Sequence, residues 1–449
     1  MRKMRYILGL STAAAVFALA GVPTPASAQT TDQVPPATGL VGAYDQIVSF
    51  GQAMAQKGVF VNIGVDENIG ALLSGGVKTG VAPVGQINGS AVFDLQTIMG
   101  LTGASVHIGF DQRSGAGGPQ GLGGPGGIAG TSVLMQYDAE SLRFGLAELY
   151  WEQGFDNDRL DFKLGRTQPT TDFLFNDISC AFISSIMCAQ PGTFYLSNNS
   201  SPYGYAQWGG RVNFQVTPQT YIRAGMYNED PSQTGFNYSG VNWNTEHSVG
   251  IFSVLQIGYK TSFANARLPS DYYIGMYNDS SSYVAANGSL AYGRQSYYAW
   301  AEQALWRPDR ATKQSLTAFA SVETYSQGSP FYGQYTAGIW DRAPFGTARP
   351  GDAFGIMASL YKHNVSQAVS EGYTGARNDQ WAFEADYDFA VARGLTIAPY
   401  VQYVANPDNP SGQPNYSSGS KNLNNDVVVG LQFILNLGAM FQMPEFVAH

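Results

Sequence analysis

The 449-residue chain has little charge, little cysteine and little histidine. Charged residues make up 13% of it, against about a quarter in a typical soluble protein. Two cysteines in so long a chain exclude a disulfide-dense scaffold. Basic residues are fewer than acidic ones, 24 against 33, and the resulting net charge of −9 argues against a nucleic-acid partner. The four histidines are His107, His247, His363 and His449. None of them stands near a cysteine or a second histidine at metal-ligand spacing, so no metal site or cofactor is expected.

Long apolar runs are also missing, except for one at the N-terminus. Three basic residues precede the apolar residues 7–22, and residues 26–28 form a small-residue cleavage site. Residues 1–28 are therefore predicted to be a secretory signal peptide, because the run is short for a membrane helix and Pro23 follows it. Removing this segment takes away three basic residues and no acidic ones, which changes the net charge to −12. An exported chain without another long apolar run is either soluble or a β-barrel.

The sequence is rich in glycine and tyrosine, and its polarity repeats with a period of two residues. Polar and apolar residues alternate in segment after segment, as where Val212 and Phe214 alternate with Arg211 and Asn213. A soluble β-sandwich also alternates, but these polar faces carry charged residues in mid-strand, and the apolar row at 427–437 is long for a sandwich strand. Strands with lipid on one face and water on the other fit better. We therefore predict an all-β, transmembrane antiparallel barrel of about 16 strands with an aqueous lumen.

The connections suggest which end of the barrel is which. Residues 217–219 and 392–394 look like tight periplasmic turns, whereas 114–130, 172–205 and 407–425 look like long extracellular loops. The first of these loops holds nine glycines without a following Gly-Lys-Ser/Thr, so it is predicted to be a mobile surface loop and not a phosphate-binding loop. The predicted divisions are a signal peptide (1–28), a leader with a short helix at 44–56 (29–57), the barrel (58–441) and a C-terminal tail (442–449).

Six short motifs, in order along the chain, resemble the carbohydrate-selective porins of Gram-negative outer membranes, the OprB family. They are WEQG at 151–154 with LGR at 164–166, GMYN at 225–228, YIGMYN at 273–278, AEQALWRP at 301–308, PYVQYV at 399–404 and GLQF at 430–433. The resemblance implies a single-chain barrel in the outer membrane that passes sugars by diffusion, surrounded by lipid, and it allows a homo-oligomer. One departure is visible: such barrels often close on a terminal aromatic residue, whereas this chain continues past Phe441.

Cys180 and Cys188 lie in the unusually apolar segment 172–205. An oxidising periplasm favours a disulfide between them over two free thiols. Because an exposed loop of this apolar character would be costly, the segment is predicted either to fold inward or to cap the barrel, and in both cases to narrow the pore.

A sugar channel needs hydrogen-bonding groups and flat aromatic faces that hold the solute only weakly. The polar rows of the predicted strands supply such candidates for the pore lining. Arg166 is included because it belongs to the family motif, although strict alternation from Leu160 points it outward unless a bulge or the end of the strand falls at Gly165. The candidates are Arg166, Arg211, Arg223, Tyr221, Tyr227, Glu229, Trp300, Glu302, Glu384, Asp386 and Gln402.

The sequence thus favours an outer-membrane porin that gives passive diffusion of mono- and small oligosaccharides, with no catalytic residues. The alternatives are a non-selective or cation-leaning general porin, an outer-membrane barrel enzyme, and a secreted soluble β-protein. The enzyme would need a serine or carboxylate with a positioned base, and His107 or His247 would have to lie near it. The carboxylates of Glu384 and Asp386 are better explained as part of a solvated lumen wall.

The acidic balance agrees with neutral sugars if it resides on external loops, such as those expected to carry Asp341 and Asp352. An acidic lumen would instead favour cations.

Overall fold

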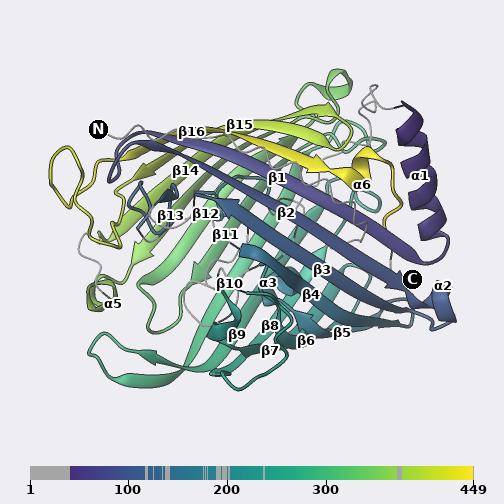
Figure 1. Ribbon diagram of the computed structural model, residues 1–449, viewed down its shortest axis with the longest axis horizontal. Coiled ribbons are helices and arrows are strands. Elements are labelled where there is room, and N and C mark those ends of the chain that lie inside the picture. The colour runs from purple at the N-terminus through teal and green to yellow at the C-terminus, as the bar shows by residue number, and fades with distance from the viewer. Residues whose placement is uncertain are drawn as a thin grey trace, which may run out of the picture.

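A closed antiparallel barrel makes up most of the chain (Figure 1). The computed structural model describes residues 41–447, apart from 117–119, 125, 134, 137–141, 175, 177, 179, 189–193, 195–199, 201–202, 236–237 and 372–376. The predicted signal peptide, residues 29–40 of the predicted leader, and His449 lie outside the described residues.

The barrel strands follow one another in chain order. They are β1 (Val59–Ser74), β2 (Gly80–Asp94), β3 (Ala104–Gly115), β4 (Leu142–Phe155), β5 (Leu160–Thr167), β6 (Gln207–Gln215), β7 (Thr220–Glu229), β8 (Gly250–Lys260), β9 (Ser270–Val284), β10 (Leu290–Trp306), β11 (Ser315–Thr324), β12 (Phe331–Arg342), β13 (Ala353–His363), β14 (Asp379–Ala392), β15 (Leu395–Ala405) and β16 (Asp426–Asn436).

Each strand pairs with its neighbours in sequence, and the first strand pairs with the last. In the closing pair, Gly64 lies opposite Asn436 and Gly70 lies opposite Gly430. Closure leaves no sheet edge with unpaired backbone groups. The predicted all-β barrel of about sixteen strands is confirmed.

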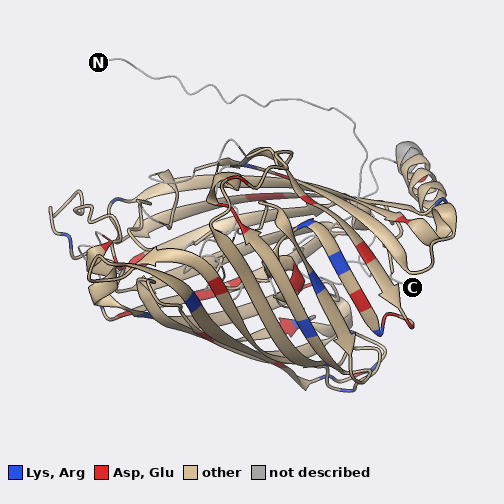
Figure 2. Ribbon diagram, turned by 90° about the horizontal axis from the view of Figure 1, so that it is seen from below, with Lys and Arg blue, Asp and Glu red and all other residues tan. Residues whose placement is uncertain are grey.

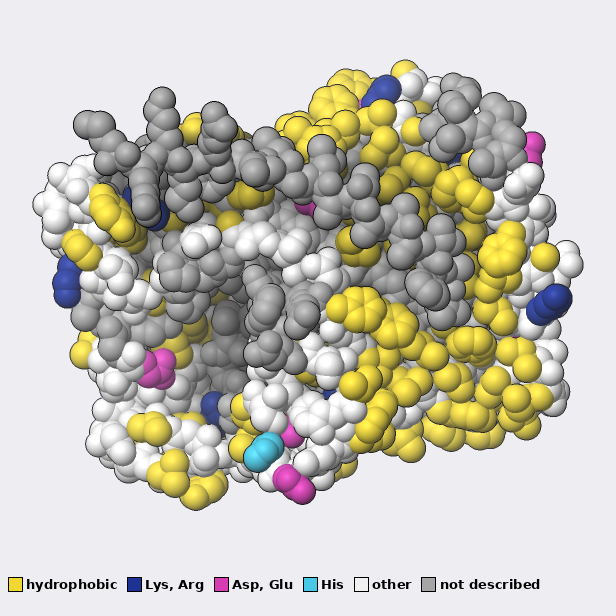
Figure 3. All heavy atoms as spheres, viewed as in Figure 1, with side chains coloured by type: hydrophobic (Ala, Val, Ile, Leu, Met, Phe, Trp, Pro, Cys, Tyr) yellow, Lys and Arg dark blue, Asp and Glu magenta, His cyan; other side chains and the backbone are white. Residues whose placement is uncertain are grey.

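The period of two separates an outer apolar face from an inner polar one. On β7, Ile222 and Met226 are exposed on the outer face, whereas Tyr221, Tyr227 and Glu229 are buried on the inner face. The same division recurs along the other strands, because successive side chains of a strand point to opposite faces. In the face shown in Figure 3, hydrophobic side chains cover most of the surface over the strands near the end that carries α1 (Val41–Ala55) and α2 (Leu95–Met99).

The two ends of the barrel differ. The end with α1, α2 and α6 (Leu437–Met440), called here the short-turn end, includes the tight turns at 216–219 and 393–394. The opposite, long-loop end includes the connections 116–141, 168–206 and 406–425. The remaining short helices lie in connections: α3 (Pro169–Phe173), η3 (Pro231–Gln233), η4 (Gly346–Ala348) and α5 (Val365–Ser370). None of the helices described is both long and apolar enough to cross a membrane.

The C-terminal boundary of the barrel differs from the prediction. The last strand ends at Asn436 and not at 441, because the Asn436 side chain accepts a hydrogen bond from the backbone N–H of Ala439 and so caps α6. At the N-terminal side, α1 covers almost the same residues as the helix predicted at 44–56.

Two expectations about loops are wrong. The glycine-rich connection after β3 is not a surface loop, because Leu122, Ile128 and Ala129 are buried in the main apolar cluster of the barrel. Asp341 and Asp352 are not on long loops either. Asp341 belongs to β12, and Asp352 lies in the connection after it, at the short-turn end, where its carboxylate is bonded to Arg349 and to the Tyr387 hydroxyl.

Candidate functional site in the barrel lumen

A row of charged residues crosses the inner face where the strands are shortest. β5 and β6 have only eight and nine residues. Their register places Glu152 opposite Lys163, and Lys163 opposite Arg211. Since directly opposed residues of antiparallel strands share a face, these side chains meet on the inner wall. Basic and acidic positions accordingly lie next to one another on neighbouring strands (Figure 2).

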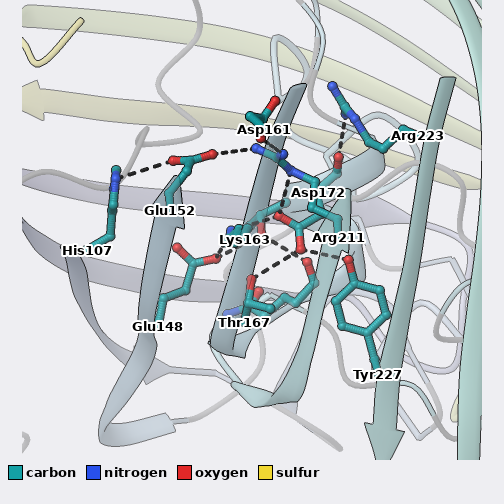
Figure 4. Close-up of polar contacts among 12 residues, drawn as sticks. His107, Glu148, Glu152, Asp161, Lys163, Thr167, Asp172, Arg211, Arg223 and Tyr227 are labelled. Carbon is teal, nitrogen blue, oxygen red and sulfur yellow. Dashed lines mark hydrogen bonds and ion pairs between the residues drawn. The ribbon is translucent and has the colours of Figure 1, made fainter. Parts of the chain in front are cut away.

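Arg211 lies at the centre of a group of charged side chains, called here the charged cluster (Figure 4). Its members are His107, Glu148, Glu152, Asp161, Lys163, Asp172 and Arg211. One terminal nitrogen, Nη2, lies 2.5 Å from Oε1 of Glu152. The other, Nη1, donates to Oδ1 of Asp161. Glu152 also contacts the inward-facing His107, with 3.4 Å between Oε2 and Nε2. The guanidinium therefore lies between two carboxylates, an arrangement that its planar fork of donors suits well.

A second set of ion pairs centres on Lys163, which lies between Glu152 and Arg211 in the strand register. The Lys163 ammonium is 2.7 Å from Oδ1 of Asp172 and 3.8 Å from Oε1 of Glu148. These side chains are almost fully buried, with exposed fractions of 5% or less. By contrast, the side chains of Glu152, Asp161 and Arg211 keep exposed fractions of 24%, 16% and 13%. Glu152, Arg211 and Asp161, called here the upper row, are thus partly exposed on the inner wall, whereas Lys163, Asp172 and Glu148 are buried beside them.

Asp172 reaches the cluster from a loop. Pro169 begins α3, where its missing N–H costs no helical hydrogen bond, and the helix carries Asp172 onto the wall. The carboxylate accepts hydrogen bonds from the Tyr227 hydroxyl at 2.7 Å and from the Thr167 hydroxyl at 3.2 Å. Burial acts to raise the pKa of Asp172, but the charges of Lys163 and Arg211, with the hydrogen bonds from Lys163 and Tyr227, together hold that pKa below its usual range. Asp172 is therefore a carboxylate at neutral pH.

The loop that begins with α3 crosses the lumen. At its start, the Phe173 ring lies 6.4 Å from the ring of Tyr227 on β7. Farther along, Phe182 packs against Phe319 of β11 and Trp340 of β12, with ring centroids 5.8 Å and 5.5 Å apart. A single loop thus contacts both β7 and the wall formed by β11 and β12.

The tip of this loop is held by a disulfide and a carboxylate. Cys180 and Cys188 are bonded to each other. The Glu384 carboxylate on β14 accepts hydrogen bonds from the backbone N–H groups of Ile183 at 2.6 Å and Ser184 at 3.1 Å. Gln402 of β15 donates to the same carboxylate. The segment folds inward, which is one of the two arrangements that the apolar character of its sequence predicted.

Apart from Arg166, the candidates for the pore lining divide into three groups. Arg211, Arg223, Tyr221 and Tyr227 meet at the charged cluster on β6 and β7, where the Arg223 guanidinium donates to the backbone oxygen of Asp172. Trp300 stacks between Tyr273 and Phe319 on the wall that the loop covers. The others are buried on the inner face outside the cluster: Glu229, Glu302, Glu384, Asp386 and Gln402.

Arg166 is placed differently from the prediction. The pairing of β5 with β6 continues without a bulge through Gly165, and Arg166 lies opposite Trp208, which is exposed on the outer face. Its guanidinium lies 5.8 Å and 5.7 Å from the rings of Trp208 and Trp243 and donates to the backbone oxygen of Asn242. Strict alternation therefore predicted its direction correctly, and the inward assignment based on the family motif is wrong.

The candidates taken from the sequence omitted every acidic residue of the cluster and also Lys163. Glu148, Glu152 and Lys163 stand on alternating strand positions, so the period of two contained a signal for them. Asp172 had no such signal, because its loop has no periodicity and its partners are fixed only by tertiary folding. Among the described residues, no three His, Cys, Asp or Glu side chains are grouped so that they could hold a metal ion.

A closed sixteen-stranded barrel with an apolar outer face, a polar inner face and a loop folded into its lumen defines a porin. The family model described as "Carbohydrate-selective porin, OprB family" matches residues 78–437. The chain belongs to this family.

Relatives agree with this assignment. "Putative porin QuiX" of Acinetobacter baylyi is 22% identical over 377 residues, which cover 78% of this chain and 82% of that relative. "Porin B" of Pseudomonas aeruginosa is 20% identical over 353 residues, covering 70% and 75%. In structure, the chain is similar to Pseudomonas putida OprB at high pH, with a TM-score of 0.74, 19% identity and coverage of 86% of this chain and 96% of that one.

The chain is therefore an outer-membrane sugar diffusion channel of Gram-negative type, as predicted. Family and fold point to a channel rather than to an enzyme, and the closed barrel with its apolar outer face argues against the soluble β-protein. In such barrels the short turns are periplasmic and the long loops extracellular. The short-turn end is accordingly the periplasmic end.

Proposed function

We propose that the channel passes mono- and small oligosaccharides and that the row Glu152–Arg211–Asp161 is where they are weakly held. The observation that carries this proposal is the contrast in exposure within the charged cluster. The upper row is accessible from the lumen, whereas the neighbouring Lys163, Asp172 and Glu148 are buried. Only the upper row can offer hydrogen bonds to a passing solute.

The chemistry of this row suits neutral polyols. Carboxylate oxygens accept hydrogen bonds from sugar hydroxyls, and the guanidinium donates to them. Because each charge already has an opposite partner, the row attracts small ions less than a lone charge would. A sugar hydroxyl that only replaces a water molecule beside an existing ion pair gains little free energy, so the sugar is held weakly. Fast flux requires such weak binding. No catalytic step is part of the proposal.

Liposome swelling with sugars of graded size tests the proposal. We expect the wild type to admit monosaccharides faster than disaccharides, and Arg211→Gln to lose part of the flux or of its dependence on sugar identity. Arg159→Gln is the matched control, since Arg159 is an exposed arginine paired with Asp156 in the turn between β4 and β5. Equal exclusion of all monosaccharides by the wild type would overturn the proposed function. An Arg211 variant that matched the Arg159 control would overturn the proposed site.

A specific observation favours a second property, a preference for cations. Buried acidic side chains clearly outnumber buried basic ones among the described residues, and Glu302, Glu323 and Glu384 extend along the inner wall far from the basic residues of β5 to β7. A carboxylate-rich lumen attracts cations. We infer that reversal potentials in a KCl gradient will show cation selectivity; anion selectivity would exclude it.

A further inference from the structure

The C-terminal segment 441–447, called here the strap, folds back onto the periplasmic end of the barrel. The Phe441 ring lies 5.7 Å from the ring of Tyr44 on α1, and the Gln442 amide donates to the Tyr44 hydroxyl at 2.7 Å. Met443 packs beside Gly51 and joins a small apolar cluster with Met54 of α1 and Val61 of β1. The strap is therefore fixed along the N-terminal helix.

The helix that precedes the strap is anchored as well. The backbone N–H of Gly438 in α6 donates to the Asn62 side chain at 2.9 Å, and Asn436 caps the helix. Positions 62, 66 and 68 of β1 lie on one face of the strand. Asp66 and Asn68 are buried on the inner side, where they contact Gln432 and Tyr400. Because Asn62 shares this face, α6 sits at the inner rim of the barrel.

Beyond these anchors, Phe446 turns into the mouth of the barrel. Its ring lies 5.4 Å from the ring of Phe60 and 5.9 Å from that of His107, with edge-on geometry in both cases. The strand register aligns Phe60 with Val92, and Val92 with His107. Phe60 lies on the same inward face of β1 as Asn62, Asp66 and Asn68. Because Val92 and His107 are directly opposed to it across the strands, they face inward as well. The contacts of Phe446 are thus with the inner wall.

Phe446 also stands beside the charged cluster. His107, which it contacts, lies 3.4 Å from Glu152, and Glu152 pairs with Arg211. A solute that leaves the exposed row toward the periplasm therefore passes next to the Phe446 ring. The segment 438–447 lies outside the residues 78–437 that the family model matches.

We propose that Phe446 is a specificity-determining residue that narrows the periplasmic mouth and limits the size of the sugars that pass. This inference rests on the proposed solute path along the charged cluster. The anchored strap holds the aromatic side chain over one side of the mouth, where its volume excludes bulky solutes and its flat face offers a weak contact to pyranose rings.

Single-channel conductance and liposome swelling of full-length variants test this inference. We expect Phe446→Ala to raise the conductance by about 1.5-fold, since conductance grows with the open cross-section of a pore. The gain in swelling rate should be larger for disaccharides than for monosaccharides. Phe446→Trp should change both quantities in the opposite direction, which keeps the inference testable even if the alanine variant fails to fold.

Two controls separate the ring from general effects at this end. Phe345→Ala removes another phenylalanine at the periplasmic end, one with an exposed fraction of 63%, and Val447→Ala alters the neighbouring residue, which is 75% exposed. Neither should alter conductance. If the wild type conducts sugars and both Phe446 variants behave like the controls, the inference is wrong while the proposed function stands. If the wild type passes no sugar, the proposed function itself fails.

Discussion

The docking of the crossing loop on Glu384 can be tested through the disulfide at its tip. In Glu384→Ala, the docked loop would leave two buried backbone N–H groups, of Ile183 and Ser184, without their acceptor. Each unsatisfied group costs about 1–3 kcal/mol, so docking should weaken by about 2–6 kcal/mol. Because about 1.4 kcal/mol corresponds to a factor of ten, even the lower value raises the undocked population about 25-fold.

The measurement is the rate at which dithiothreitol reduces the Cys180–Cys188 disulfide in folded protein in detergent. The disulfide is buried inside the barrel when the loop is docked, so the rate follows the undocked population if loop opening is fast relative to reduction. We expect the order Glu384→Ala fastest, then Glu384→Gln, then wild type, because glutamine keeps one acceptor oxygen. Asp379→Asn is the control, since Asp379 is a half-exposed residue of the same strand.

Heat-dependent gel mobility shows whether each variant remains a folded barrel before the rates are compared. A Glu384→Ala variant that is folded and reduced at the wild-type rate would refute the view that this carboxylate holds the loop in place.

The remaining predictions concern pH and strand packing. Because the pKa of Asp172 is held below its usual range, this carboxylate stabilises loop docking at neutral pH, and the contribution is lost as pH falls through the lowered pKa. Conductance in the wild type should therefore change only at strongly acidic pH. At pH 7, Asp172→Asn should already show the conductance that the wild type reaches only in acid. An Asp172→Asn conductance equal to that of the wild type at pH 7 would contradict this prediction. In Gly430→Ala, the added methyl would lie 2.2 Å from the Tyr400 ring, so we expect a loss of about 1–3 kcal/mol in unfolding by denaturant. In the double variant, Tyr400→Ala should relieve most of that clash, so the loss in unfolding free energy should be smaller than the sum of the two single losses. Strictly additive losses would show that the methyl does not clash with the Tyr400 ring.

The barrel and its two faces were predictable from the sequence, because alternation in a strand is a local property. Ile222 and Met226 face outward and Tyr221 and Tyr227 inward as their positions require. The same rule gave the direction of Arg166 correctly, and the error came from letting a family motif override it. Part of the candidate site followed as well, since Arg211 and Arg223 stand on the polar face of β6 and β7.

The sequence by itself thus determined a closed barrel with an apolar outer surface and a polar lumen, since a slip of one residue in any strand would turn its apolar row toward the lumen. Only the tertiary structure decided what lies inside that lumen. Asp172 meets Lys163 because a loop turns inward, Glu384 meets Ile183 across about two hundred positions of sequence, and Phe446 meets His107 because the C-terminal strap folds back onto the barrel mouth. In each of these contacts one partner lies in a segment without periodicity, so no local pattern records the contact. The contacts of Glu384 and Phe446 also join residues far apart in sequence, which only the tertiary fold brings together.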